Sequence, residues 1–167
     1  PLCGPSRASL MTGLYPDQTG HHRLRDLIRD HVPNAVTLPQ AFHNQGYATA
    51  RVGKIYHYDN PRGIGTPGHD DAASWEERYF PKGIDKEIED RIFSLRPGAF
   101  GATLSWLAAE GTDEEHTDGL VATKSIELLE RYARDEQPFF LAVGFYKPHT
   151  PYVAPRKYFE RYPQDQI

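Results

Sequence analysis

Reactive side chains gather in three short segments of this 167-residue sequence. The first segment holds a cysteine and an arginine four positions apart, and each of the other two holds a lysine followed closely by a histidine. The residues are Cys3, Arg7, Lys54, His57, Lys147 and His149. Lysine, arginine and histidine together suit a compact anion such as a phosphate or a sulfate ester. The pattern predicts an anion site if the fold unites the three segments.

Each of these residues also has an ordinary structural explanation. A lone cysteine such as Cys3 is most often a small buried hydrophobic group. Lys54 is compatible with a solvated strand end, and His57 with a partner for loop carbonyls. Arg7 is compatible with an ion pair, and the two prolines of residues 147–151 would make a rigid turn whatever His149 does. Their combination, rather than any single residue, therefore favours chemistry.

The elements that must position these residues begin with a predicted helix from Pro5 to about Leu14, which Gly13 ends. Cys3 would then lie just before a helix N-terminus. A second helix is expected after the capping residue Thr37 and is stopped by Gly46. Small and β-branched residues predict a strand over residues 47–54.

The second half of the chain is predicted to contain two more helices and a buried strand. Residues 58–83 are expected to form a long loop rich in Pro, Gly and Asp. Four apolar residues at helical spacing predict an amphipathic helix: Ile84, Ile88, Ile92 and Leu95. Pro97-Gly98 is expected to end it. Asp118 is expected to cap a long helix to about Arg134, with Val121, Leu128, Leu129 and Tyr132 on its apolar face. The apolar run 139–145 is typical of a strand buried on both faces.

This order of helices and strands predicts an α/β fold with a mainly parallel sheet flanked by helices, in one domain. Parallel sheets carry their sites beyond the carboxyl ends of the strands, where loops and helix N-termini meet. Lys54 and His57 follow the first predicted strand, and Lys147 and His149 follow the last. We therefore expect the two pairs to share one edge with the segment around Cys3.

Composition excludes several other classes of protein. The 19 Lys and Arg residues against 23 Asp and Glu give a net charge of −4, which argues against a nucleic-acid-binding protein. No apolar run approaches the roughly 18 residues of a membrane span. The single cysteine excludes an intrachain disulfide and a multi-cysteine metal site. Because the sequence opens without Met or a signal-like segment, we expect a fragment whose targeting is not readable.

The segment Cys3-x-Pro5-Ser6-Arg7 followed by Thr12-Gly13 resembles the signature of the type I sulfatases. The resemblance continues through residues 53–57, 122–123 and 138–149, which are similar to the iduronate-2-sulfatase-like branch. It implies the alkaline-phosphatase/sulfatase-like fold. Residues 1–167 would be a partial catalytic domain that lacks the N-terminal first strand and the C-terminal part.

The resemblance implies hydrolysis of sulfate esters, on a sulfated sugar or glycosaminoglycan. Cys3 would be converted to Cα-formylglycine, whose hydrate carries one hydroxyl that attacks sulfur and a second whose deprotonation releases sulfate. Arg7 would hold this diol and Lys54 would neutralise sulfate charge. His57 would orient the diol or take its proton, and His149 would bind sulfate or assist the leaving alcohol. Lys147 is a weaker candidate for substrate binding.

The family resemblance also implies one divalent cation, typically Ca²⁺, with Cys3 as formylglycine among its ligands. The other ligands would lie outside the fragment, which should be inactive alone. Asp70-Asp71 is rejected as a substitute because the pair lies in a loop and follows no apolar strand. Other implied partners are a formylglycine-generating enzyme and a sulfated small-molecule or glycan substrate. The implied compartment is the periplasm, the cell exterior or the lysosome.

Three other functions remain open from sequence. A phosphatase or phosphodiesterase of the alkaline-phosphatase superfamily would share the sheet and the anion pocket, but such enzymes use Ser or Thr where this chain has Cys3. A non-catalytic sulfoglycan-binding relative would use the basic stretch, although an ordinary solvated surface is the favoured explanation of it; its residues are His21, His22, Arg23, Arg25 and Arg29. A thiol hydrolase lacks a base adjacent to the cysteine.

Overall fold

The computed structural model describes residues 2–166. The helices are α1 (Cys3–Thr12), α2 (Pro16–Thr19), α3 (Ile28–His31), α4 (Leu38–His43), α5 (Ile84–Glu87), α6 (Thr117–Arg134) and α7 (Arg156–Phe159). The strands are β1 (Ala48–Gly53), β2 (Glu77–Tyr79), β3 (Phe93–Ser94), β4 (Ser105–Ala109), β5 (Phe139–Gly144) and β6 (Tyr152–Pro155). Short 3-10 turns cover Ala72–Ser74, Glu89–Arg91, Asp113–Glu115 and Gln164–Gln166.

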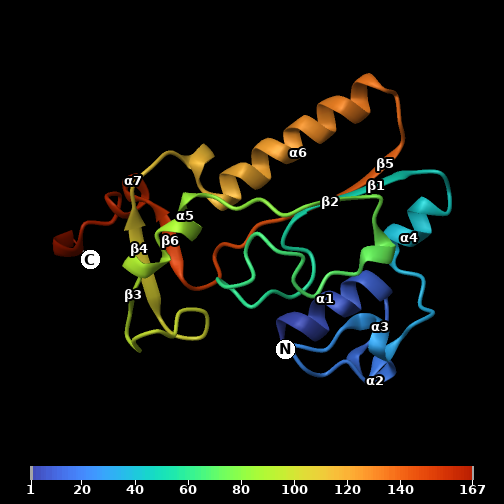
Figure 1. The fold of residues 1–167 in the computed structure, drawn as a ribbon, viewed down its shortest axis with the longest axis horizontal. Coiled ribbons are helices and arrows are strands. Elements are labelled where there is room, and N and C mark those ends of the chain that lie inside the picture. The colour runs from blue at the N-terminus through green and yellow to red at the C-terminus, as the bar shows by residue number, and fades with distance from the viewer. Residues whose placement is uncertain (1, 167) are drawn as a thin grey trace.

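The main sheet is parallel throughout, in the order β2-β1-β5. Strand β1 pairs with β5 over its whole length, from Ala48 opposite Phe139 to Gly53 opposite Gly144. Helix α6 lies along one face of this sheet, and α1 and α4 lie on the other side (Figure 1). The predicted α/β fold with a parallel sheet flanked by helices is therefore confirmed.

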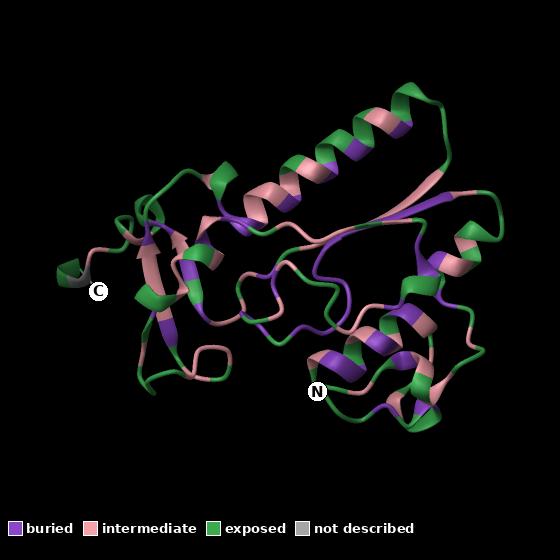
Figure 2. Ribbon diagram, in the orientation of Figure 1, coloured by how far each residue is buried: buried purple, intermediate pink, exposed green. Residues whose placement is uncertain are grey.

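Two hydrophobic clusters hold the helices to the sheet. On one face, side chains of α6 pack on β1; this cluster contains Ala48, Ala50, Val52, Val121, Leu128 and Tyr132. On the other face, Ala8 and Met11 of α1 pack with Phe140 and Ala142 of β5. Residues alternate between the two faces along each strand, so one strand serves both clusters. Leu129 was predicted on the apolar face of α6 but is exposed. Figure 2 shows that buried and exposed stretches of ribbon alternate along α6.

A second, smaller sheet, in the order β3-β4-β6, was not predicted. The expected helix over residues 84–97 is wrong: α5 ends at Glu87, a 3-10 turn follows, and β3 begins at Phe93. The isoleucine spacing reflects a different core, because Ile92 packs with Ala109 and Val153 of the small sheet. Pairing of β3 with β4 replaces the helical hydrogen bonds that the pattern had suggested.

Three further boundaries differ from the sequence predictions. Helix α1 already begins at Cys3, so the cysteine lies in the first turn instead of before it. The loop predicted over residues 58–83 contains the parallel strand β2, whose three residues are too few to give a periodic signal. Strand β5 is only partly buried, because it forms an edge of the main sheet within residues 2–166. The apolar run of β5 was expected to be buried on both faces.

A buried ion pair fixes the long loop that follows β1. The Arg51 side chain is fully buried in the middle of β1 and donates to Asp70 Oδ1 (2.8 Å) and to the hydroxyl of Tyr58 (3.1 Å). The guanidinium also lies 4.8 Å from the centre of the Phe80 ring. Both charges of the pair are removed from water, so separating them would leave a buried charge without a partner. The pair therefore fixes the position of the loop.

Two glycines adopt the left-handed backbone conformation, but only one of them also lies close to a neighbouring strand. Gly46 (φ +84°) has open space where a Cβ would lie, whereas at Gly53 (φ +74°) a Cβ would lie 2.2 Å from the carbonyl oxygen of Gly144. We expect Gly46→Ala to lower the free energy of unfolding by about 1 kcal/mol. Gly53→Ala should cost at least about 2 kcal/mol more, because it forces β1 and β5 apart.

Denaturant unfolding of the full-length protein measures both changes, with Gly46→Ala as the matched control. Equal destabilisation by the two variants would contradict the close approach of Gly53 to Gly144.

Candidate active site

The carboxyl ends of β1 and β5 bring the two lysine–histidine segments together. Lys54 follows β1 directly and donates its backbone N–H to the carbonyl of Gly144, the last residue of β5, at 2.7 Å. Lys147 and His149 come from the loop that follows Gly144. The full in-register pairing of the two strands leaves both segments at one edge of the sheet.

The first turn of α1 reaches the same edge. Cys3 and Arg7 lie four residues apart and therefore project from one face of the helix. The Arg7 guanidinium donates through Nη1 to the carbonyls of Lys54 (3.0 Å) and Ile55 (2.7 Å). Arg7 thus ties the helix that carries the half-buried, unbridged Cys3 to the end of β1. Cys3 is near enough to Lys54 for its charge to raise the pKa of that lysine.

The site is positively charged and partly withdrawn from water. Lys54 is buried, and burial lowers its pKa, as do the neighbouring charges of Arg7 and Lys147. Cys3 and Asp118 act in the opposite direction and raise the pKa of Lys54. Burial also lowers the pKa of Lys147, whose Nζ donates to the carbonyl of Pro151 (2.8 Å). An anion placed here would offset the repulsion between the cations.

The two histidines are kept neutral by the same surroundings. Burial, followed by the charges of His69 and Lys54, lowers the pKa of His57 to about 4. Burial likewise lowers the pKa of His149, as do the charges of Lys54 and Lys147. The His149 Nδ1 lies 2.6 Å from the carbonyl oxygen of Thr150. Because a carbonyl only accepts, Nδ1 carries the hydrogen and Nε2 is left with a free lone pair.

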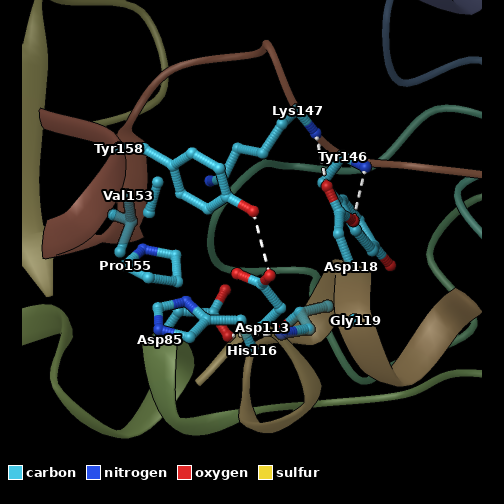
Figure 3. Close-up of a pocket in the computed structure, with 12 residues that line it drawn as sticks. Asp85, Asp113, His116, Asp118, Gly119, Tyr146, Lys147, Val153, Pro155 and Tyr158 are labelled. Atoms are coloured by element: carbon cyan, nitrogen blue, oxygen red, sulfur yellow. Dashed lines mark hydrogen bonds between the residues drawn. The ribbon is translucent and has the colours of Figure 1, made fainter. Parts of the chain in front are cut away.

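Asp118 belongs to the site, and the sequence analysis missed this role. It was expected to cap α6, but it lies within the first turn of the helix, where His116 is the N-cap residue. Its carboxylate accepts the backbone N–H groups of Tyr146 (2.8 Å) and Lys147 (2.9 Å), as Figure 3 shows. Asp118 therefore holds the loop that carries Lys147 and His149 against the start of α6.

A cavity of about 280 Å³ lies beside Asp118 but is not the meeting point of the predicted residues. Figure 3 shows its acidic side chains turned toward partners within the chain. Asp85 accepts from the backbone N–H and the hydroxyl of Thr117, each at 2.7 Å. Asp113 accepts from Lys157 (2.7 Å) and Tyr158 (2.9 Å). Asp85 thus connects α5 to the start of α6, and Asp113 connects the turn before α6 to α7.

The described residues do not form a complete metal site. Residues 2–166 contain no group of three His, Cys, Asp or Glu side chains that could hold one ion. Asp70 is occupied by Arg51, and Asp71 accepts from Arg29 Nε (3.0 Å) and from Ser74 (2.6 Å). Both carboxylates are therefore engaged in ion pairs with arginine side chains.

The basic stretch of residues 21–29 is not one continuous cationic surface. His21 is buried and stacks on His31, with the ring centres 5.5 Å apart. Arg29 is paired with Asp71 at 2.6 Å. Arg25 is exposed and lies 3.7 Å from Asp59, next to the site. These three side chains lie in different environments and do not form one surface. The arrangement therefore gives no support to a polyanion-binding face.

These features define a class of protein: a parallel α/β fold whose strand ends gather cations and neutral histidines around a cysteine on a helix. The sulfatase family model matches residues 1–167. The chain belongs to the sulfatase family. No helix within residues 2–166 has the length and apolar character needed to cross a membrane.

Individual relatives agree with this assignment. The chain is 33% identical to iduronate 2-sulfatase of Homo sapiens, over 99% of this chain and 30% of that protein. It is 32% identical to a sulfatase of Formosa agariphila, over 100% of this chain and 34% of that one. The chain therefore spans about a third of the length of these relatives.

A solved structure shares the fold. The phosphonate monoester hydrolase of Agrobacterium radiobacter superposes with a TM-score of 0.65 at 20% identity, covering 96% of this chain and 34% of that one. The predicted resemblance to sulfatases and to the alkaline-phosphatase-like fold is confirmed, while the roles of the six predicted residues stay predictions.

The neutral state of His57 is directly measurable. In an NMR titration of the full-length protein, we expect the His57 ring to titrate near pH 4 and not near 6.5. The unfolded chain then binds more protons between these values, so the contribution of His57 to stability falls as the pH drops from about 6.5 to about 4. Asp59→Asn should lower the pKa of His57 further, because the Asp59 charge raises it.

The resonance is assigned by its loss in His57→Gln. Titration of that resonance near pH 6.5 would contradict the burial and the cationic surroundings of His57.

Proposed function

We propose that the full-length protein hydrolyses sulfate esters of a sulfated sugar or glycosaminoglycan, with Cys3 as the precursor of the nucleophile. The observation that carries this proposal is the position of Cys3. It lies on the same helix face as Arg7, whose guanidinium reaches the backbone of buried Lys54. A reacting group at residue 3 would therefore face cations suited to the sulfate oxygens.

Conversion of Cys3 to Cα-formylglycine by a formylglycine-generating enzyme would supply the hydroxyl nucleophile of a hydrated aldehyde. Arg7 would orient this group, because only its Nη1 is engaged with backbone carbonyls among the described residues. Lys54 would neutralise charge on the sulfate oxygens. Its lowered pKa reflects burial and repulsion by Arg7 and Lys147, which a bound anion would offset.

The histidines would move protons. In its Nδ1–H form, His149 keeps Nε2 available, and its protonated form would deliver a proton to the leaving alcohol. His57 would orient the hydrated group or accept its proton; its Nε2 lies 3.8 Å from Asp59 Oδ1. Lys147 would support sulfate binding from the loop that Asp118 holds in place.

A divalent cation, Ca²⁺ by family resemblance, would complete the site and polarise the sulfate group. Formylglycine at position 3 would be one ligand, and the remaining ligands would come from parts of the protein outside residues 1–167. The described residues form no complete cation site by themselves. We further propose a periplasmic, extracellular or lysosomal location, on the same resemblance.

A phosphatase or phosphodiesterase reaction is the second candidate. The likeness to a phosphonate monoester hydrolase supports a shared fold alone, because the identity is 20%. The cysteine at position 3, within the sulfatase signature, favours sulfate. Comparing matched sulfate and phosphate esters of one alcohol would separate the two reactions.

The nucleophile is tested in full-length protein produced together with a formylglycine-generating enzyme. Mass spectrometry of the peptide that contains residue 3 should show an aldehyde in place of the thiol. Cys3→Ala should lower kcat/KM for a sugar sulfate by at least about 10³-fold, because the variant has no nucleophile at residue 3. Leu10→Ala is the matched control, because Leu10 lies on the exposed side of α1 and should keep full activity.

An intact thiol in fully active protein would refute the assignment of Cys3, and so would unchanged turnover by Cys3→Ala. Thermal unfolding of both variants establishes that a loss of turnover is not a loss of fold.

A further inference from the structure

The carbonyl of Thr150 meets two side chains, and one of them belongs to the candidate active site. His149 Nδ1 lies 2.6 Å from this oxygen, and Asn60 Nδ2 donates to it at 3.0 Å. A carbonyl oxygen has two lone pairs and can accept both hydrogens at once. Because the oxygen has no hydrogen to give, the His149 ring carries its hydrogen on Nδ1. The position of one backbone carbonyl therefore sets the tautomer of His149.

The turn that contains this carbonyl is also held at its two ends. At the start, Asp118 accepts two backbone N–H groups of the turn. At the end, the hydroxyl of Thr150 donates to the carbonyl of Gly101 (2.8 Å). These contacts fix where the turn lies, but they do not touch the Thr150 carbonyl. The hydrogen bond from Asn60 is the one that reaches this oxygen.

Asn60 enters the turn from a well-packed part of the loop after β1. The residue is buried, and its backbone N–H donates to the carbonyl of Tyr58 (2.9 Å). The buried Tyr58 ring packs edge-on against the ring of Tyr146, with the ring centres 5.5 Å apart. Because Tyr146 begins the turn that carries His149, the same loop contacts that turn both through an aromatic pair and through the Asn60 amide.

Packing alone does not explain an asparagine at position 60. The Asn60 Oδ1 atom is buried and has no hydrogen-bond partner among residues 2–166. A buried polar atom without a partner lowers stability, and a leucine of similar size would avoid that cost. Exchanging the amide oxygen and nitrogen would bring two acceptors together at Thr150, so Nδ2 is the atom that donates. This donor is what a hydrophobic residue could not supply.

We propose that Asn60 is a positioning residue for His149: by holding the Thr150 carbonyl, it keeps the ring in its Nδ1–H form and leaves Nε2 for the leaving alcohol. The inference rests on the proposed function, in which His149 delivers a proton. Burial lowers the pKa of His149, and the hydrogen bond to Thr150 opposes this effect. The fixed carbonyl therefore favours the protonated ring as well as the orientation from which it reacts.

The tautomer is measured directly in full-length protein labelled with ¹⁵N-histidine. Long-range ¹H–¹⁵N correlation spectra distinguish an Nδ1–H ring from an Nε2–H ring, and the His149 signals are assigned by their loss in His149→Gln. At about pH 7 the wild type should show the Nδ1–H form, and Asn60→Leu should raise the share of the Nε2–H form. Asn44→Leu is the matched control, because Asn44 is exposed at the end of α4.

A kinetic comparison separates positioning from a general loss of structure. The full-length protein, with the aldehyde verified at residue 3, is given a sugar sulfate and nitrophenyl sulfate. Asn60→Leu should lower kcat for the sugar sulfate about tenfold with little change in KM, because this leaving alcohol needs a proton. Nitrophenolate leaves without one, so its kcat should change by less than about twofold.

Asp118→Asn serves as the comparison for a loosened turn. This change weakens the hold on the start of the turn and does not touch the Thr150 carbonyl. It should lower turnover of both esters alike and leave the His149 tautomer unchanged. Thermal unfolding verifies that each variant is folded.

An Nε2–H ring in the wild type would overturn the role of Asn60, and so would a folded Asn60→Leu variant that keeps the tautomer or loses both esters equally. If Asn60→Leu does not fold, Asn60→Asp takes its place; it has the same shape, presents an oxygen where Nδ2 donates, and should show the same selective loss. Failure of the aldehyde-bearing wild type to hydrolyse either ester would overturn the proposed function, whereas the tautomer measurement does not depend on turnover.

Discussion

The parallel pairing of β1 with β5 is the constraint on which the site depends. These strands are 91 residues apart in their paired positions, yet they match residue for residue from Ala48–Phe139 to Gly53–Gly144. Gly53 and Gly144 permit a backbone approach that a Cβ would block. Because the pairing runs to the last residue of each strand, the segments that follow leave the sheet at one place. A shift of register would separate Lys54 from Lys147 and His149.

The carboxyl ends of β1 and β5 are positively charged because several cationic side chains are buried there close together. Lys54 is buried near Arg7 and Lys147, and burial is the main cause of its lowered pKa. The chain offsets part of this cost with Asp118, whose carboxylate also binds the loop N–H groups. Such a preorganised cluster stabilises a negative group better than mobile surface cations would. Burial, together with nearby charges that include Lys54, lowers the pKa of His57 and of His149.

The loop after β1 is defined by ion pairs instead of by regular secondary structure. Arg51 binds Asp70 and Arg29 binds Asp71, so adjacent carboxylates are anchored to two different parts of the molecule. Removing one partner from a buried pair typically costs about 3–5 kcal/mol, because the other charge stays buried alone. The two ion pairs therefore anchor the end of the loop that begins with Lys54 and His57.

The sequence by itself determined the motif around Cys3, the strand predicted over residues 47–54, the long helix and the α/β class, because these rest on local spacing and on hydrophobic periodicity. It also determined that lysine–histidine pairs follow two strands. Only the tertiary structure decided that Ile92 packs in a second sheet, that Asp118 binds the loop after β5 instead of capping α6, and that Arg25 lies near Asp59. Those outcomes depend on contacts between residues far apart in the chain, and local pattern carries no information about which distant partner a side chain will meet.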